Sequence, residues 1–489
     1  MNFDVIKNLI WKFSERMLAQ VVTFVVSIVL ARLLSPAEYG TIALVMVFIT
    51  IADVFANAGF GNALIQKLHV DNVDYSSVLY LSLGISFIIY GILFISAPYI
   101  ADFYNSASLC MVLRVLGIRV PIAAFNSVQQ AYVSKNMLFK RFFFSTLFGT
   151  LLSGVVGCVM AYNGFGIWSL VGQYLTNTIV DTTVLWFTVK WRPDLVFSFK
   201  RVKTLFSFGW KLLVSSLLDT GYQQLRSLVI GGKYTSSDLA YYNRGQQYPQ
   251  LVVTNVNTSI SSVLFPAISK NQENLEVVKN MTRRAIKTSS YIMWPLMFGL
   301  AIVSKPLVSW MLTDKWLPCV PYLQIACFNY AFWPIHTANL EALKAIGRSD
   351  LFLKLEVIKK IIGLGLLIGS MNFGVMAIAL SMIVATILNS FINAYPNSKI
   401  LKYSYMDQIR DMMPSILLSL FMSVVIYPIS FIISNSLLLI IVQIFVGAII
   451  YILFSRIFKF ESFMYIINMI KNRKNKGLSK TFLFYKRKV

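Results

Sequence analysis

Polar side chains recur at helical spacing inside long apolar runs, and they are the residues of this chain that could bind a ligand. In the first such run, polar residues follow one another three or four positions apart, which places them on one face of a helix. The basic and amide residues on such faces are Arg16, Gln20, Arg119, Asn126, Gln130, Lys211, Arg226, Arg244, Gln250 and Asn257. Because polar groups inside a membrane face the bundle interior or a wet cavity, we expect a central cavity lined from both halves of the chain.

The basic residues on these faces suit a phosphate group, since the planar guanidinium donates two parallel hydrogen bonds to it. Arg119 and Arg226 lie deep in their runs and are predicted to face the cavity. Arg16, Lys211 and Arg244 lie nearer the ends, where the alternative is a side chain that reaches back to the membrane surface. For the Ser, Thr and Asn positions the alternative is hydrogen bonding between helices. A pyrophosphate head group therefore fits this cavity better than a cationic drug.

Three acids, Asp53, Asp219 and Glu341, share these faces. Each could pair with a base or bind a coupling proton or sodium ion. Asp219 and Arg226 are seven residues apart on one face, which favours an ion pair. Asp53 has no base within two turns of its own run, so both readings stay open.

The composition predicts an all-α polytopic membrane protein. Mean hydropathy is +0.67, with 57% hydrophobic and 13% charged residues, whereas soluble domains carry roughly 25% charged residues. We expect fourteen membrane spans, at about 17–34, 41–60, 76–97, 111–133, 142–161, 165–189, 205–230, 245–268, 288–312, 321–343, 355–371, 374–396, 414–433 and 436–455.

The net charge of +24 follows the pattern of a membrane protein. Basic residues gather in alternate connections between runs, which predicts that both termini are cytoplasmic. The basic tail from Arg456 to Val489 is expected to contact anionic membrane lipids. No pattern of interleaved basic and aromatic residues indicates nucleic-acid binding.

No motif predicts catalysis or a cofactor. The four cysteines show no CxxC spacing, and HExxH, GxSxG and P-loop sequences do not occur. A membrane polysaccharide polymerase or ligase would need an ordered active site, usually on a large external loop. The longest external connection expected here, near Pro98 to Ser108, is short. We therefore expect a protein that is not an enzyme and holds no metal.

An internal repeat predicts two lobes of six helices related by an axis along the membrane normal. Ala161–Leu170, which opens the sixth span, resembles Ser370–Leu380, which opens the twelfth. The predicted organisation is an N-terminal lobe at 1–195, a C-terminal lobe at 196–402, two accessory spans at 403–456 and a basic cytoplasmic tail at 457–489.

Short motifs in a fixed order resemble a known family. They are Leu30–Gly40, Ala52–Asp53, Gly59–Gln66, Gly166–Val171, Trp191–Pro193 and Leu264–Ser269. Together they resemble the Wzx-type polysaccharide and O-antigen flippases, in particular the colanic-acid and teichuronic-acid branch of the multidrug/oligosaccharidyl-lipid/polysaccharide exporter superfamily.

The resemblance implies a flippase of the bacterial inner membrane that moves an undecaprenyl-diphosphate-linked oligosaccharide from the cytoplasmic to the outer leaflet by alternating access. Its implied partners are this lipid-linked substrate and a polysaccharide polymerase of the same pathway, which makes surface polysaccharide such as lipopolysaccharide or exopolysaccharide. The alternative within the superfamily is a drug/ion antiporter, in which acids would dominate the cavity.

Overall fold

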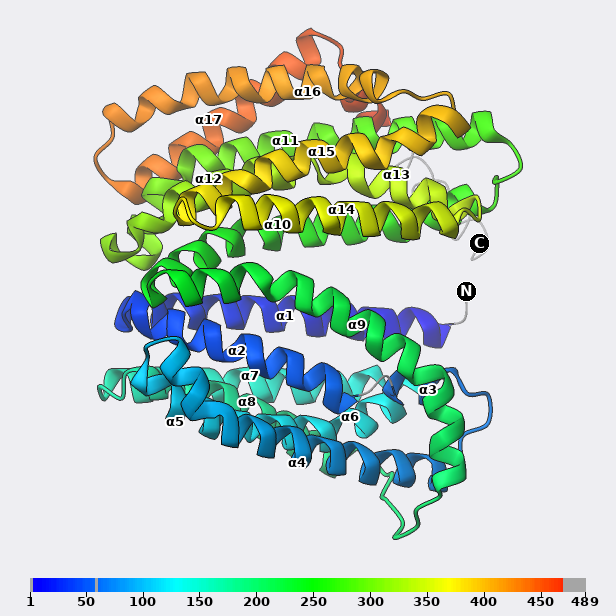
Figure 1. Cartoon of the computed structure of the whole chain (residues 1–489). Helices are drawn as coiled ribbons and strands as arrows, with labels where there is room; N and C mark the ends of the chain where they lie inside the picture. The colour runs from blue at the N-terminus through cyan, green and yellow to red at the C-terminus, as the bar shows by residue number, and fades with distance from the viewer. Residues whose placement is uncertain (1–2, 58–59, 469–489) are drawn as a thin grey trace, which may run out of the picture. The chain divides into compact units, whose positions relative to one another are not determined.

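The structure is a computed structural model that describes residues 3–57 and 60–468. Over these residues every regular element is a helix, which confirms the all-α class (Figure 1). By contacts the chain forms two compact units, Met1–Asn243 and Arg244–Val489, called here the N-terminal unit and the C-terminal unit. The lobe boundary expected after residue 195 rests on the internal repeat in the sequence and stays a prediction.

The elements that lie in the N-terminal unit are α1 (Phe3–Leu33), α2 (Pro36–Asn57), α3 (Phe60–Gln66), α4 (Asn72–Phe103), α5 (Ala107–Gly117), α6 (Arg119–Lys135), α7 (Phe139–Tyr162), α8 (Ile167–Thr188) and α9 (Phe199–Lys233). The first residues of α10 (Ser236–Ser269) also belong to it. The C-terminal unit holds the rest of α10, then α11 (Leu275–Leu312), η1 (Asp314–Cys319), α12 (Val320–Ala331), α13 (Trp333–Ala345), α14 (Ser349–Ser370), α15 (Val375–Ile400), α16 (Tyr405–Ile426), η2 (Tyr427–Phe431) and α17 (Ser436–Ile457).

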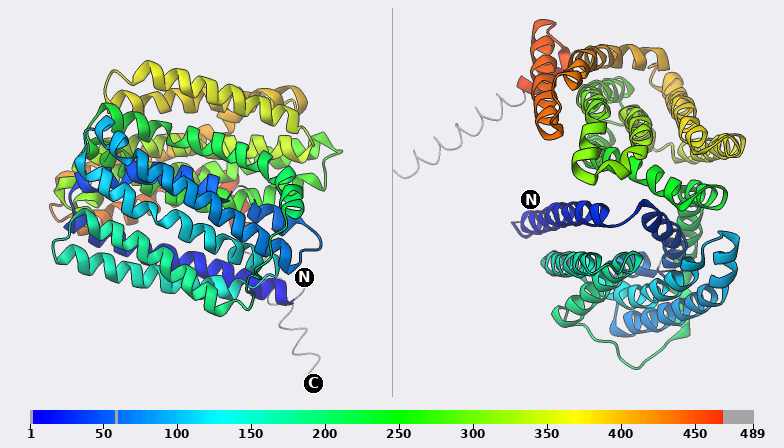
Figure 2. Two further views of the ribbon diagram at one scale, coloured as in Figure 1. Left: turned by 60° about the horizontal axis from the view of Figure 1, so that its bottom comes forward. Right: turned by 90° about the vertical axis from the view of Figure 1, so that its left-hand side faces the viewer.

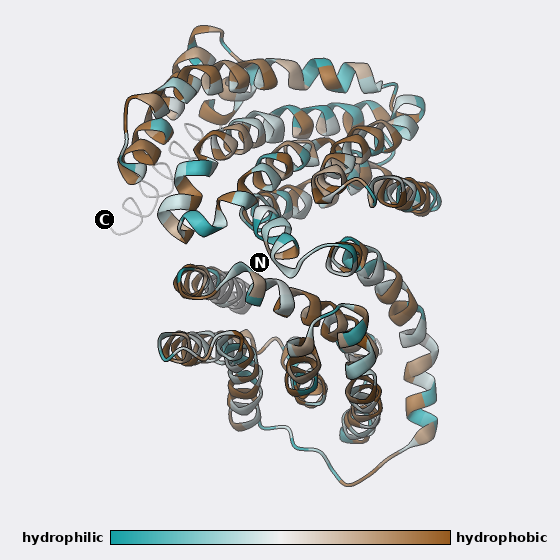
Figure 3. Cartoon of the chain, turned by 60° about the vertical axis from the view of Figure 1, so that its left-hand side comes forward, coloured by the Kyte–Doolittle hydropathy of each residue, from teal (hydrophilic) through white to brown (hydrophobic). Residues whose placement is uncertain are grey.

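Each predicted span lies in one helix or in two consecutive helices. Within the described residues, 9 helices are long and apolar enough to cross a membrane. Hydrophobic residues follow these helices over most of their length (Figure 3). The chain is therefore a polytopic membrane protein, and the count of fourteen spans stays a prediction. In each unit taken by itself, most long helices lie side by side (Figure 2).

The connection expected near Pro98 to Ser108 is shorter than predicted, because α4 continues through Pro98 to Phe103 and α5 begins at Ala107. Proline is tolerated inside membrane helices, where neighbouring groups satisfy the carbonyl that it frees. The prediction of a loop at Pro98 was therefore wrong.

Matching local structures recur in the two halves of the chain. Before α2, Ser35 and Glu38 exchange backbone and side-chain hydrogen bonds, and Thr235 and Asp238 do the same before α10. Positive-φ glycines precede both α8 and α15. The fourth and tenth spans are each broken, at Ile118 and at Phe332. These parallels support the internal repeat.

A buried carboxylate holds one end of the N-terminal unit together. Asp74 at the start of α4 is fully buried and accepts from Lys67 Nζ at 2.6 Å and Arg201 Nη1 at 3.3 Å. Arg201 also pairs with Asp71 at 2.6 Å. The backbone N–H of Asp74 and the Arg201 guanidinium lower the pKa of the Asp71 carboxyl. This cluster ties α4 to the start of α9.

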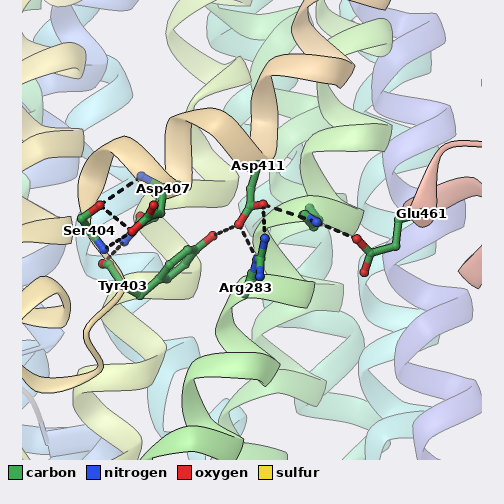
Figure 4. A network of polar contacts seen from close by, with 8 residues as sticks. Arg283, Tyr403, Ser404, Asp407, Asp411 and Glu461 are labelled. Carbon is green, nitrogen blue, oxygen red and sulfur yellow. Dashed lines mark hydrogen bonds and ion pairs between the residues drawn. The ribbon is translucent and has the colours of Figure 1, made fainter. Parts of the chain in front are cut away.

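In the C-terminal unit α11 contacts α12, α13, α16 and α17, and a second charged network stands where it meets α16 (Figure 4). Asp411 accepts from Arg283 Nε at 2.7 Å and Nη2 at 2.8 Å, and from the Tyr403 hydroxyl at 2.7 Å. Lys287 lies 3.3 Å from Asp411 and 2.6 Å from Glu461. The network therefore joins α11, α16 and the helical residues 461–468.

We predict that Asp411→Asn destabilises the protein by about 1.5–3 kcal/mol, because it removes the charge that accepts a bidentate arginine hydrogen bond at a nearly buried position. The measurement is thermal unfolding of the purified protein in detergent. Asp350→Asn, which breaks the exposed Arg348–Asp350 pair, is the control and should leave the midpoint unchanged. Equal midpoints for Asp411→Asn and the wild type would contradict this role.

Candidate functional site

Arg119 opens α6 directly after the break at Ile118 and lies among three helices of the N-terminal unit. Its Nε donates to Thr178 Oγ1 of α8 at 3.1 Å, and its Nη1 lies 3.9 Å from the Met46 sulfur of α2. It also acts electrostatically on Asp53 of α2. The base near Asp53 is therefore on another helix, where spacing along one span could not reveal it.

Asp53 keeps one oxygen unsatisfied. Its Oδ1 is buried and has no hydrogen-bond partner. An orphaned carboxylate oxygen in a low-dielectric interior is costly, which is typical of a group that accepts a ligand or a proton in another state.

Asn126 lies in a network that the sequence analysis missed. Its Nδ2 donates at 2.7 Å to Asp181 Oδ2 of α8, and the Ser145 hydroxyl of α7 donates to Oδ1 of the same carboxylate. Asp181 is the one charged residue in the sixth predicted span. A lone acid in an apolar run is a signal that could have found it. Here it serves as a half-buried acceptor that joins three helices.

The expected Asp219–Arg226 ion pair is not among those formed by the described residues. Asp219 instead accepts from Gln223 Nε2 at 2.9 Å, one turn further along α9. Seven residues place two side chains about 10.5 Å apart along the helix axis, which is far for a direct contact. Arg226 acts electrostatically on Tyr242, and its buried Nε has no hydrogen-bond partner.

Arg244 is packed into the C-terminal unit. Its guanidinium lies 4.9 Å from the ring centroid of Trp316, and its Nη1 donates to Gln247 Oε1 at 2.7 Å. The side chain is 5% exposed. This geometry assigns Arg244 a structural contact with η1.

The remaining predicted residues have varied surroundings. Asn257 accepts from the Thr337 hydroxyl of α13, and Glu341 accepts from Lys344 at 3.3 Å on its own helix. Lys211, Gln130 and Gln250 are exposed, and Gln20 is half-buried. Arg16 lies in α1, with its side chain outside the described residues.

A buried amide cluster in the C-terminal unit was also missed. Asn339 Nδ2 donates to Gln408 Oε1 at 2.7 Å, and Asn397 Nδ2 donates to Asn339 Oδ1 at 2.8 Å. The cluster joins α16 to α13 and α15 through hydrogen bonds between buried amides on three helices.

Arg119 and Arg226 of the N-terminal unit have the chemistry to bind an anion. Over the described part of the chain, no group of three or more His, Cys, Asp or Glu side chains is arranged to hold a metal ion. Arg119 and Arg226 offer donors in the N-terminal unit, and both lie in helices that carry further polar residues. Such donors can hold a phosphate and release it without a covalent step.

Known structures share this fold. The lipid II flippase MurJ in an inward closed conformation matches with a TM-score of 0.73 at 18% identity, over 93% of this chain and 98% of that one. An inward-facing multidrug resistance transporter of the MATE family, from the MOP superfamily, matches with a TM-score of 0.62 at 17% identity, over 81% of this chain and 99% of that one.

Three of the relatives in sequence are bacterial proteins named for polysaccharide biosynthesis. The teichuronic acid biosynthesis protein TuaB of Bacillus subtilis (strain 168) is 24% identical over 78% of this chain and 79% of its own. The lipopolysaccharide biosynthesis protein WzxC of Escherichia coli (strain K12) is 23% identical over 84% of each. The succinoglycan biosynthesis transport protein ExoT of Rhizobium meliloti (strain 1021) is 23% identical over 70% of each.

These relatives confirm the resemblance to Wzx-type exporters that the motifs indicated. Residues 29–321, more than half of the chain, match the family described as polysaccharide biosynthesis protein. The chain belongs to this family of polysaccharide biosynthesis proteins.

Proposed function

We propose that this chain is a flippase that carries a lipid-linked oligosaccharide across the inner membrane for surface polysaccharide biosynthesis. The observation that carries the proposal is the family match together with a fold shared with a lipid flippase. The finer substrate assignment is an oligosaccharide on undecaprenyl diphosphate, moved from the cytoplasmic to the outer leaflet.

The binding residues of this proposal come from both halves of the chain. Arg119 and Arg226 hold the diphosphate: Arg119 uses its Nε for Thr178, and the buried Nε of Arg226 has no hydrogen-bond partner. Gln20, Asn126, Gln130, Gln250 and Asn257 contact sugar, with Arg16 and Lys211 at the ends of the cavity. Arg244 enters this set only as a support, because Trp316 and Gln247 already hold it.

Among the three acids, Asp53 is the best ion-coupling candidate. Its orphaned Oδ1 can take a proton or contribute to a cation site, whereas Asp219 and Glu341 already accept from Gln223 and Lys344. The relatives named for polysaccharide biosynthesis make the drug/ion antiporter the less supported reading. Anionic lipids at the basic tail and a polymerase that takes up the product complete the proposal.

We predict that Arg119→Ala and Arg226→Ala each lower transport roughly tenfold or more, since losing a hydrogen bond to a charged group costs about 1.5–3 kcal/mol. Each variant complements a gene deletion, and surface polysaccharide and accumulated lipid-linked repeat units are measured. Arg114→Ala is the control, because the Arg114 side chain contacts Phe94. Its guanidinium lies 4.4 Å from the centroid of the Phe94 ring, and its Nε donates to the Phe94 carbonyl at 3.2 Å.

Loss of surface polymer with accumulation of the lipid-linked unit in both variants, at normal expression, supports the assignment. Normal polymer from both variants would remove Arg119 and Arg226 from the site. Intact polymer after deletion of the gene would contradict the flippase function itself.

The membrane potential should drive this transport. A head group of charge near −2 that leaves a negative interior gains roughly 2.3 kcal/mol per charge per 100 mV. We predict that collapsing the potential with valinomycin and potassium slows export in cells while the pH gradient is held constant. An unchanged rate would show that the potential does not supply the driving force.

A further inference from the structure

A groove in the C-terminal unit lies apart from every residue assigned above. It is lined by the second half of α10, the first half of α11 and Tyr465, and its volume is about 940 Å³. Pockets for small molecules measure roughly 300–1,000 Å³, so the groove is large enough for a ligand. Its apolar wall includes Val256, Ile260, Val263, Met281, Ala285 and Ile292.

One basic residue, Arg284, lines this apolar groove, and no acid is among the described lining residues. The two basic residues near it on α11 form ion pairs outside the groove. Arg283 pairs with Asp411, and Lys287 pairs with Asp411 and Glu461 (Figure 4). Arg284 instead lies 4.9 Å from the ring centroid of Tyr465. Contact with the face of a ring leaves the guanidinium N–H groups available to a phosphate.

The wall formed by Tyr465 is held in place. Residues 461–468 are helical, and Glu461 at their start pairs with Lys287 at 2.6 Å. Phe463 packs against Tyr291 of α11, with ring centroids 6.5 Å apart. The groove therefore has two walls from α10 and α11 and a third from the chain after α17.

The apolar wall alone would select nothing, because membrane lipid is as apolar as the wall and no water is displaced. Selection must come from the charge at Arg284, with the Asn280 amide also in the lining. An occupant therefore needs a phosphate group joined to a long hydrocarbon chain. The groove lies at the end of α10 and the start of α11, on the side where the charge pattern places the cytoplasm.

We propose that this groove is a loading site for the isoprenoid diphosphate carrier, with the diphosphate on Arg284 and the first part of the chain between α10 and α11. The inference rests on the proposed flippase function and adds a site to it. The diphosphate carries more charge than the single phosphate of a phospholipid, which favours the carrier over bulk anionic lipid at a guanidinium. Arg284 then meets the substrate in the leaflet from which it is exported.

The test measures binding of undecaprenyl diphosphate to the purified full-length protein in detergent by native mass spectrometry. Undecaprenol, inorganic pyrophosphate and phosphatidylglycerol are the comparison ligands. Arg284→Gln removes the charge, and Ala285→Phe fills the groove. Lys279→Gln is the matched control, because it removes a charge on the same helix from a residue outside the lining.

We expect Arg284→Gln and Ala285→Phe to weaken binding of undecaprenyl diphosphate by roughly tenfold, and Lys279→Gln to change it less than about twofold. Undecaprenol and pyrophosphate should bind more weakly than the intact carrier. Thermal unfolding of each variant checks that it is folded, and a third variant, Ile260→Phe, tests the opposite wall if Ala285→Phe fails to fold.

Wild-type affinity in Arg284→Gln and in the folded groove-filling variant would overturn the proposal. So would equal binding of phosphatidylglycerol, which would make the groove a site for bulk lipid, or equal binding of undecaprenol. Complementation separates this failure from that of the proposed function. If deletion of the gene blocks export but Arg284→Gln restores it fully, the loading site falls and the flippase stands.

Discussion

Inside a hydrocarbon bilayer no water is available to a polar side chain, so its hydrogen-bond partner must come from the protein. The rest of the structure depends on this constraint. Asp181 meets it by accepting from Asn126 and Ser145, which joins α6, α7 and α8. Asn339, Gln408 and Asn397 meet it as a cluster that fixes α16. Asp53 Oδ1 and Arg226 Nε are among the buried polar atoms without a hydrogen-bond partner, and the proposed function assigns them to an ion and to the substrate.

The same constraint separates support from binding among the arginines. Arg244 contacts the Trp316 ring and the Gln247 amide oxygen inside the C-terminal unit. Arg119 contacts a hydroxyl and a thioether, and it lies directly after a helix break. Arg284 stands at the edge of an apolar groove with an aromatic ring as its neighbour. An anionic lipid would find favourable charge at the last two positions.

Hydropathy predicted the helices well, because a run of apolar residues long enough to cross a bilayer leaves few alternatives to a helix. The breaks at Ile118 and Phe332 were not predicted, since the prolines that follow them suit the first turn of a helix equally well. The spacing of polar residues along a helix predicted which of them share a face, but it did not predict which residues they contact. Asp53 and Arg119 lie on different helices. Asp219 accepts a hydrogen bond from Gln223, one turn away, whereas Arg226 lies two turns away. Contacts between helices depend on packing, which a single span does not encode.

Transport by the purified protein alone tests the central claim most directly. The protein is reconstituted into vesicles that carry a fluorescent undecaprenyl-diphosphate-linked oligosaccharide in both leaflets, and the fraction accessible to a membrane-impermeant quencher is followed over time. We predict that the wild type makes nearly all of the lipid-linked oligosaccharide accessible, whereas protein-free vesicles expose only the outer-leaflet half. Equal accessibility with and without the protein, under an imposed membrane potential of either sign, would contradict the claim that this chain moves the lipid-linked oligosaccharide across the bilayer.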